Sequence, residues 1–288
     1  MAVSSVAVVT DTTACIPPEK VAEYGIELVP IELIFGSKVY RDGIDISPTE
    51  FYAMLRQADK LPTTSGSLPG PFLDAYRRAS RRAGSILCIT ESSKFSGMAN
   101  SARLAMEMAR KELPGVNIKV MECSSAAAGQ GLVVLAAVRA AASGKSLDET
   151  VEVVTGLMPR VHLFASLDTL DYLVKGGRVP QAAALVNSIL KIRPVFSVDG
   201  GEAHTLALPR STDSAISNIL RLMGRKIGKG QPIHVAVMHA DALEQAHYLR
   251  KQIASRFNCL ELFITEFTPV MGVHTGPGVI GAAFYSEE

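Results

Sequence analysis

Short apolar runs separated by helical segments constrain the fold of this chain most. "SVAVVTD" and "SILCIT" are almost continuously apolar and rich in β-branched residues, and "IKVMEC" is similar. Such runs are typical of strands covered on both faces in a parallel sheet. The segment "SPTEFYAMLRQA" between them opens with Ser47, Pro48 and Glu50, the pattern of a capped helix start. Strand, turn and helix alternate, which predicts a parallel βαβ domain.

The pattern changes near residue 160, where we place a domain boundary. A second capping box, Ser146 with Glu149, opens the last helix before it. After it, "LDYLVKGG" predicts a helix stopped by Gly176 and Gly177 in left-handed conformations. "RPVFSVDGGEAHTLAL" predicts a hairpin, and "IHVAVMHA" and "LELFITEF" predict further strands. We expect two domains, residues 1–160 and residues 161–288, both α/β, the second with an antiparallel element.

Composition and charge exclude several classes of function. Apolar residues make up 48% of the 288 residues and aromatic residues only 6%, so the core is aliphatic. The net charge of +1, without a basic tail, argues against a nucleic-acid-binding protein. The basic segment "RRASRR" is most simply the solvated face of a helix. The chain lacks a signal-peptide pattern and a segment long enough to span a bilayer, so we expect a cytoplasmic protein.

The four cysteines predict neither disulfides nor a metal site. They stand far apart, at positions 15, 88, 123 and 259, and Cys88 lies within an apolar run. Buried free thiols are the expected state, and we expect no zinc. "GPGVIG" has the spacing of a dinucleotide-binding motif, but no βαβ unit follows it in the sequence. We expect no cofactor.

Polar turns after the predicted strands are the best candidates for a binding site, because ligands of open α/β sheets bind at the carboxyl ends of the strands. The turn "TESSKFSG" places Ser92, Ser93 and Ser96 before a helix that begins near Gly97. A serine there is either an ordinary helix cap or, together with the helix N–H groups, an anion ligand. The sequence "LPTTSGSLPGPF", which includes Thr64, is either a linker or a second loop that offers hydroxyl groups.

Several stretches, taken in order, resemble the DegV family of bacterial fatty-acid-binding proteins. "VVTDTTACIP" resembles the family's opening strand and turn, and "SSKFSGMANSA" its serine-rich turn. "PTTSGSLPGPF" is similar to its Thr-Thr-Ser-x-Pro loop, although Gly66 and Ser67 depart from the common pattern, as does Met98 in the serine-rich turn. "LDYLVKGGRVP" and "HTGPGVIG" are similar to its later signatures. The likeness covers nearly the whole chain.

The resemblance implies a two-domain DegV-like fold and a bound long-chain fatty acid. It implies that the carboxylate of this ligand is bound by Thr64 and Ser96, with Gly97 and His274 beside them. It assigns Arg178 and Arg210 to the head-group neighbourhood or to partner docking. An apolar sleeve is expected in the second domain, from "LVNSILKIRPVF" and "LELFITEF".

Three functions remain open from the sequence. The first is a lipid-binding protein, not itself an enzyme, that presents the fatty acid carboxylate to a separate ATP-dependent fatty acid kinase for acyl phosphate formation. The second is an acyl hydrolase with Ser96 as nucleophile and His274 as base. The third is a lipid-responsive regulatory protein, which differs from the first in its partner.

Overall fold

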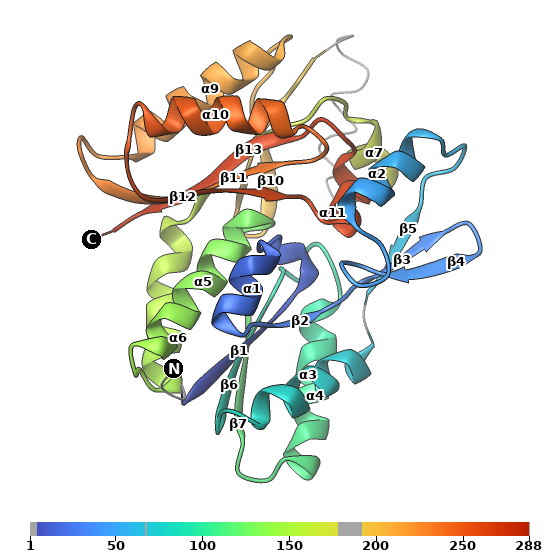
Figure 1. The fold of residues 1–288 in the computed structure, drawn as a ribbon, viewed down its shortest axis with the longest axis vertical. Helices are drawn as coiled ribbons and strands as arrows, with labels where there is room; N and C mark the ends of the chain where they lie inside the picture. The colour runs from blue at the N-terminus through green and yellow to red at the C-terminus, as the bar shows by residue number, and fades with distance from the viewer. Residues whose placement is uncertain (1–4, 67, 178–191, 288) are drawn as a thin grey trace.

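The structure is a computed structural model that describes residues 5–66, 68–177 and 192–287. Figure 1 shows a parallel sheet in the lower half of the molecule and a larger sheet in the upper half. A small third sheet lies at the side, next to both. The protein is a mixed α/β protein, as the sequence predicts.

The lower sheet is formed by the first half of the chain, and all its strands are parallel. The apolar runs of the sequence are its central strands. In sheet order the strands are β2 (Glu27–Val29), β1 (Val6–Asp11), β6 (Ser85–Thr90) and β7 (Asn117–Glu122).

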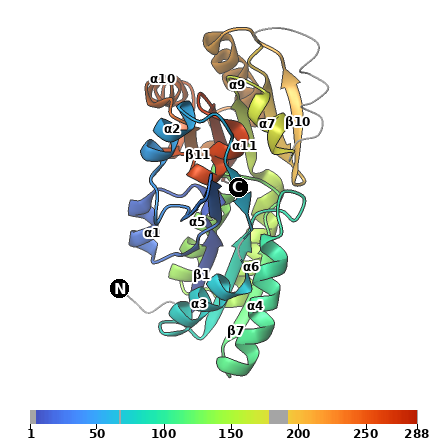
Figure 2. The ribbon, with the colours of Figure 1, turned by 90° about the vertical axis from the view of Figure 1, so that its right-hand side faces the viewer.

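Helices cover both faces of the parallel sheet (Figure 2). Ala7 and Val9 of β1 pack toward α3 and α4, whereas Val6 and Val8 pack toward α5 and α6. This alternation explains why the strand is apolar at every position. The helices of this half are α1 (Pro18–Tyr24), α2 (Pro48–Arg56), α3 (Pro69–Ser80), α4 (Met98–Glu112), α5 (Ala128–Ala142) and α6 (Leu147–Leu157), with short 3₁₀ turns at Thr12–Ala14 and Met158–Arg160.

Local signals in the first half are confirmed. Both capping boxes are present, at the start of α2 and of α6. Asp11 caps the 3₁₀ turn after β1 by accepting from the Thr13 backbone N–H. The arginines of "RRASRR" lie on α3 and just after it, where Arg77, Arg78 and Arg82 form ion pairs with Asp74, Glu112 and Glu27.

The small sheet was not predicted from the sequence. It is antiparallel, with strand order β4-β3-β5, and Thr64 of β5 pairs with Leu33 of β3. Residues 63–65, expected to be part of a loop, therefore add a short strand to it. The strands are β3 (Glu32–Phe35), β4 (Lys38–Arg41) and β5 (Thr63–Ser65).

The upper sheet is formed by the second half of the chain and is mostly antiparallel. Only β11 and β12 pair in parallel among its described strands, so the antiparallel character extends well beyond the predicted hairpin. Helices α9 (Thr212–Lys226) and α10 (Leu243–Ala254) cover its outer face. In sheet order the strands are β10 (Glu202–Ala207), β9 (Val195–Asp199), β8 (His162–Ser166), β13 (Ile280–Ser286), β11 (Pro232–His239) and β12 (Asn258–Glu266).

The glycine pairs of the second half confirm one predicted turn in full and one predicted helix end in part. Gly200 and Gly201 both have positive φ in the β9–β10 turn, as the predicted hairpin requires. Gly177, which has a φ of 67°, is the C-cap residue of helix α7 (Asp171–Gly176). Gly176, expected to be left-handed as well, is the last residue of the helix instead. A second short helix, α11 (Pro269–Thr275), follows β12.

The strands of the two large sheets separate at residue 160, since the parallel sheet lies wholly before it and the upper sheet wholly after it. We retain this position as the proposed boundary between residues 1–160 and 161–288. The halves are in contact, because α5 of the first half packs on β11 and β13 of the upper sheet.

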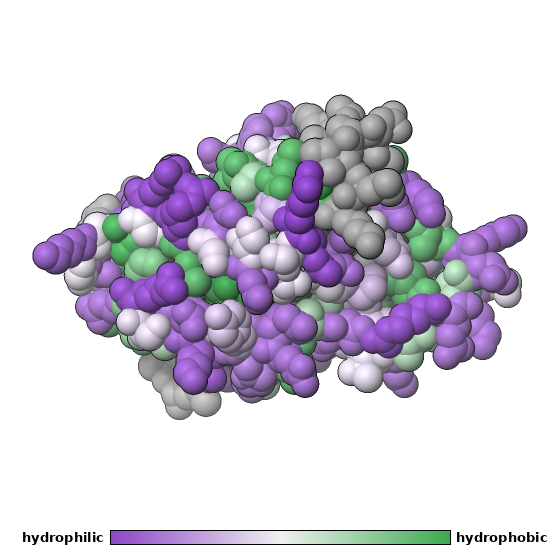
Figure 3. All heavy atoms as spheres, turned by 90° about the horizontal axis from the view of Figure 1, so that it is seen from above, coloured by the Kyte–Doolittle hydropathy of each residue, from purple (hydrophilic) through white to green (hydrophobic). Residues whose placement is uncertain are grey.

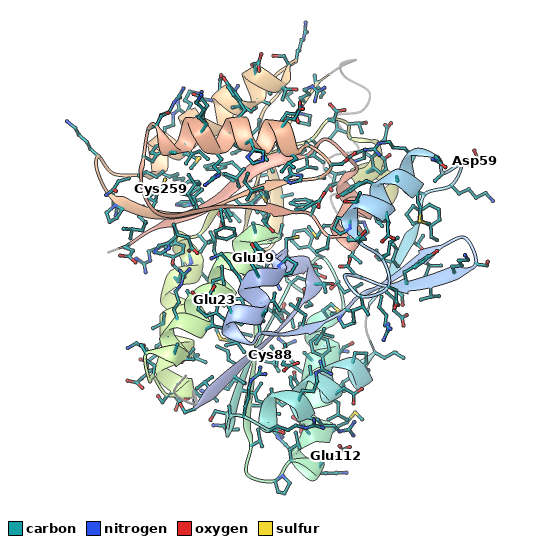
Figure 4. All side chains as sticks on the ribbon, viewed as in Figure 1. Glu19, Glu23, Asp59, Cys88, Glu112 and Cys259 are labelled. Carbon is teal, nitrogen blue, oxygen red and sulfur yellow. The ribbon has the colours of Figure 1, made fainter. Side chains whose placement is uncertain are left out.

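The described surface is polar over the outer helices, and apolar groups there form small separate patches (Figure 3). Cys15, Cys88 and Cys123 are buried free thiols and Cys259 is half-buried. Figure 4 shows Cys88 in the parallel sheet and Cys259 far from it, at the edge strand β12. None of the described helices is long and apolar enough to cross a membrane.

Candidate functional site

A pocket lies between the two halves of the chain, against the inner face of the upper sheet. Its open space, counting the mouth, is about 1160 Å³. Strand β8 and the residue after it contribute alternate side chains to the pocket: Leu163, Ala165 and Leu167. Phe164, which lies between them, packs on the outer helices. Helix α5 covers the neighbouring part of the same face, at β11 and β13. The pocket therefore occupies the part of the inner face that α5 leaves uncovered.

Both halves of the chain line the pocket, although the sequence placed the lipid site in residues 161–288. The expected sleeve contributes Phe196 and Phe267 within the described residues, but most of "LELFITEF" lies in β12, at the far edge of the sheet. The remaining apolar lining is Ile31, Phe95, Ala126, Ala127, Leu173, Val198, Ala203, Val270, Met271 and Val279.

All four residues predicted to bind a carboxylate line this one pocket. Thr64 comes from β5 of the small sheet and His274 from α11, and Thr64 Oγ1 lies 3.1 Å from His274 Nε2. Ser96 and Gly97 come from the turn between β6 and α4. Residues far apart in the sequence thus present two hydroxyl groups, one imidazole and a helix start to one space.

Ser96 is hydrogen-bonded to an acid that the sequence reasoning did not single out. Its hydroxyl donates to Glu91 Oε1 at 2.6 Å, and its oxygen accepts from the Met98 backbone N–H at 3.3 Å. Glu91 is the first residue after β6, is only 8% exposed and lines the pocket. Its position directly after a buried strand, in the turn that holds the serines, is the sequence signal that could have identified it.

Two helices begin at the pocket. The N-cap residues are Gly97 for α4 and Ala127 for α5, and both line the pocket. Neither residue has a side chain that accepts a hydrogen bond from its helix. Ala127 has a positive φ of 47° with a ψ of −131°, a backbone conformation that costs about 1–3 kcal/mol in a residue other than glycine. Helix starts carry partial positive charge, so both favour a negatively charged or polar group at this position.

A buried carboxyl group fixes the loops behind the pocket. Asp11 is fully buried and accepts from the backbone N–H groups of Thr13 and Glu91, at 3.1 and 3.0 Å. The Thr13 hydroxyl and the Gln130 amide donate to it as well. Burial raises the pKa of Asp11, while these hydrogen bonds act in the opposite direction. Asp11 thereby joins the turn after β1 to Glu91 of the turn after β6.

Glycines at two contact points allow α11 to pack closely on α7 and α2. A Cβ on Gly176 would stand 2.7 Å from His274 Nδ1, and one on Gly272 would stand 2.6 Å from Cε1 of the buried Phe51. Real Cβ contacts are essentially never this short. Helix α11, which carries His274, is therefore packed against α7 on one side and α2 on the other with no room for a methyl group at these positions.

Of the two predicted arginines, one lies in the described part of the chain, and it does not line the pocket. Arg210 is exposed in the connection between β10 and α9, and the pocket lining does not include it. Arg178 lies outside the described residues. No group of three or more His, Cys, Asp or Glu side chains in the described part of the chain is placed to hold a metal ion.

The fold and the site together define a mixed α/β protein with an apolar pocket between the two halves of the chain and a cluster of hydroxyl, imidazole and carboxyl groups in the lining of this pocket. A family model described as "Uncharacterised protein, DegV family COG1307" matches residues 5–287. The chain belongs to the DegV family.

Relatives and solved structures agree with this assignment. A DegV domain-containing protein of Streptomyces coelicolor is 32% identical over 98% of each chain. The structure of a DegV family protein from Thermus thermophilus, described as fatty acid binding, has a TM-score of 0.90 at 29% identity, over 98% of this chain and 100% of that one. DegV of Bacillus subtilis, described as a fatty acid binding protein, has a TM-score of 0.88 at 27% identity, over 99% and 100%.

Proposed function

We propose that this protein binds a long-chain fatty acid in the pocket and presents its carboxylate to a separate ATP-dependent fatty acid kinase for acyl phosphate formation. The observation that carries the binding step is one pocket with mostly aliphatic walls that also contains Thr64, Ser96 and His274. The relatives from Thermus thermophilus and Bacillus subtilis, described as fatty acid binding, support the choice of ligand.

The chemistry of the lining suits both parts of such a ligand. About fourteen buried methylene groups contribute roughly 11 kcal/mol before the cost of association. The carboxylate must be hydrogen-bonded, because burial of an unpaired charge is costly. The hydroxyl groups of Thr64 and Ser96, the imidazole of His274 and the start of α4 at Gly97 are the groups we assign to it. The acyl chain thus supplies affinity, and the polar groups supply orientation.

The kinase step rests on the family resemblance and on the absence of a nucleotide-binding motif from the sequence. We assign Arg178 and Arg210 to docking of this partner. The exposed position of Arg210 outside the pocket favours docking over direct contact with the ligand. We place this function in the cytoplasm. The alternative function, a lipid-responsive regulator, would use the same pocket with another partner.

The hydrolase hypothesis is less well supported by the geometry. A serine nucleophile needs to donate its proton to a base that an imidazole commonly provides. The single proton of the Ser96 hydroxyl is donated to Glu91, and Nε2 of His274 lies beside Thr64. These contacts fit a binding site in which each polar group is held in a fixed orientation. Turnover of a chromogenic ester, abolished in Ser96→Ala, would favour the hydrolase.

Loss of the Thr64 hydroxyl is expected to weaken fatty acid binding. Thr64→Val keeps the shape of the side chain and removes one hydrogen bond to the carboxylate, so affinity should fall roughly ten- to a hundredfold. Titration of the delipidated protein with palmitate measures this change. Thr63→Val, on the adjacent exposed residue of the same strand, is the matched control and should bind with unchanged affinity. Equal affinity of Thr64→Val and the wild type would show that the carboxylate lies elsewhere.

Charge reversal at Arg210 is expected to impair the kinase step more than lipid binding. Arg210→Glu should keep its affinity for palmitate, because the side chain lies outside the pocket lining. The rate of acyl phosphate formation with the partner kinase should fall, and Arg225→Glu near the end of α9 provides a control for surface charge. A normal rate in Arg210→Glu would contradict the docking role. Arg210 would then be an ordinary surface residue, whose ion pairs are worth only about 0–1 kcal/mol.

A further inference from the structure

The pocket has walls from both halves of the chain, and two of these walls meet at the end of one hairpin. Strands β9 and β10 contribute Phe196, Val198 and Ala203 to the pocket lining. The turn between β6 and α4, residues 91–97, contributes Ser96 to the same lining. Figure 2 shows the lower end of the β9–β10 hairpin against the loops of the first half. The hairpin is therefore both a pocket wall and a neighbour of the turn that presents Ser96.

The end of the hairpin is held on the first half by polar contacts. The Gly201 backbone N–H donates to the carbonyl oxygen of Ser124, in the turn between β7 and α5, at 2.8 Å. Lys94, in the turn after β6, donates from Nζ to the Gly200 carbonyl oxygen at 3.1 Å. The same Nζ forms an ion pair with Glu202 Oε1 at 2.7 Å. We call this set of contacts the latch.

The packing at the centre of the latch leaves no room for a side chain. Gly201 is buried, and a Cβ on it would stand 2.4 Å from Ser92 Oγ and 3.0 Å from Ser92 Cβ. Its φ of 73° also favours glycine. Gly200, one residue earlier, has a φ of 57° but is exposed, and a Cβ there would meet nothing within 4 Å. The two glycines share the backbone requirement, and only Gly201 is fitted closely to the first half.

The latch is the weaker of two contacts between the halves that flank the pocket. On one side, α5 packs on β11 and β13 through a buried aliphatic face. On the other side, the hairpin lies at the edge of the sheet, because β10 pairs only with β9 among the described strands. Both partners of the latch ion pair are about half exposed, and such pairs contribute little. Segments with few buried apolar contacts open most readily, so we expect the halves to separate first at the hairpin.

We propose that the latch is a gate for fatty acid exchange: the hairpin releases the turn after β6, the acyl chain passes between the two walls, and the latch closes over the bound chain. The inference rests on the proposed function, because it takes the acyl chain to lie against Phe196, Val198 and Ala203. A gate acts on entry and exit alike. Weakening the latch therefore raises the association and release rates by the same factor and leaves the affinity unchanged.

The test measures both rates for palmitate on the delipidated protein, with release followed as loss of radiolabelled palmitate to an excess of unlabelled palmitate. In Gly201→Ala the added methyl group pushes the hairpin away from Ser92 and breaks the hydrogen bond to Ser124. Loss of this bond should raise both rates roughly two- to tenfold, with the affinity unchanged. Gly200→Ala is the matched control, since it has the same backbone cost without the contact, and both of its rates should equal those of the wild type.

A reversible cross-link makes the opposite change. The Cβ positions of Ser92 and Gly201 lie 3.0 Å apart, and a disulfide spans about 3.5–4.5 Å, so a small shift of the hairpin accommodates one. In oxidised Ser92→Cys/Gly201→Cys both rates should fall about tenfold or more below those of the reduced form, and a reductant should restore them. Ser92→Cys alone controls for the native thiols, of which Cys259 is half-buried. Melting temperatures report whether each variant is folded.

The results separate the gate from its alternatives. Equal increases of both rates in Gly201→Ala, together with slow exchange in the oxidised double variant, support the gate. Faster release with unchanged association would mean a damaged wall and would overturn it. Wild-type rates in Gly201→Ala and in the oxidised form, or equal effects of Gly200→Ala and Gly201→Ala, also overturn it, and all three results leave the proposed function intact. Failure of the wild type to bind palmitate overturns the proposed function and the inference together.

Discussion

Replacement of Gly176 by alanine is expected to lower the affinity for a fatty acid roughly ten- to a hundredfold, the effect of losing one hydrogen bond to a charged group. The added Cβ would stand 2.7 Å from His274 Nδ1 and 3.6 Å from His274 Cα. The imidazole must rotate or shift to relieve this contact, and its position 3.1 Å from Thr64 is lost. Titration with palmitate measures the affinity.

The adjacent glycine provides a matched control. A Cβ on Gly177 would meet nothing within 4 Å, but its φ of 67° is unfavourable for other residues. Gly177→Ala should therefore reduce stability by about 1–2 kcal/mol and keep the affinity. Gly176→Ala should lower the affinity, whereas its effect on stability is the sum of the cost of the close contact with His274 and a gain of about 1 kcal/mol in helix propensity. Unchanged affinity in Gly176→Ala would mean that the position of His274 does not matter for binding.

Replacement of Gly272 by alanine is expected to destabilise the protein by about 1–3 kcal/mol, the usual cost of overpacking. The Cβ would lie 2.6 Å from Phe51 Cε1 and 2.8 Å from the Tyr52 hydroxyl oxygen, and both rings are almost fully buried. Neither ring has space to withdraw, so α11 must move away from α2. Thermal unfolding should begin several degrees earlier, since 1 kcal/mol corresponds to about 2–4 °C in a protein of this size class.

Gly224 in α9 is the control for this substitution. It also lies in a helix, but a Cβ there would meet nothing within 4 Å. Gly224→Ala should raise stability by up to about 1 kcal/mol through helix propensity alone. If Gly272→Ala melts at or above the wild-type temperature, the close packing of α11 on α2 is not required for the fold.

The sequence predicts those parts of the fold that depend on local patterns. The capping boxes at Ser47 and Ser146, the hairpin turn at Gly200 and Gly201, and the doubly covered strand β1 are confirmed, because each depends on neighbouring residues or on burial of a whole run. The short strand β5 was missed. Its three residues are polar, and only pairing with β3 makes them a strand.

Only the part of the site that depends on sequence motifs was predictable. Thr64, Ser96, Gly97 and His274 were found through motifs, and the structure places them in one pocket. Its apolar walls could not be identified, because core and pocket lining have the same composition and differ only in whether other side chains pack against them. Glu91 could have been singled out from its position directly after a buried strand, but its 2.6 Å hydrogen bond with Ser96 is visible only in the structure.

Native mass spectrometry of the protein purified without detergent tests the central claim most directly. The proposal predicts a species heavier than the apoprotein by one long-chain fatty acid, which organic extraction removes and identifies. After delipidation, added palmitate or oleate should restore the shift at one molecule per chain. A spectrum that shows only the apoprotein, with no shift at any concentration of either fatty acid, would contradict the proposal that this pocket binds a fatty acid.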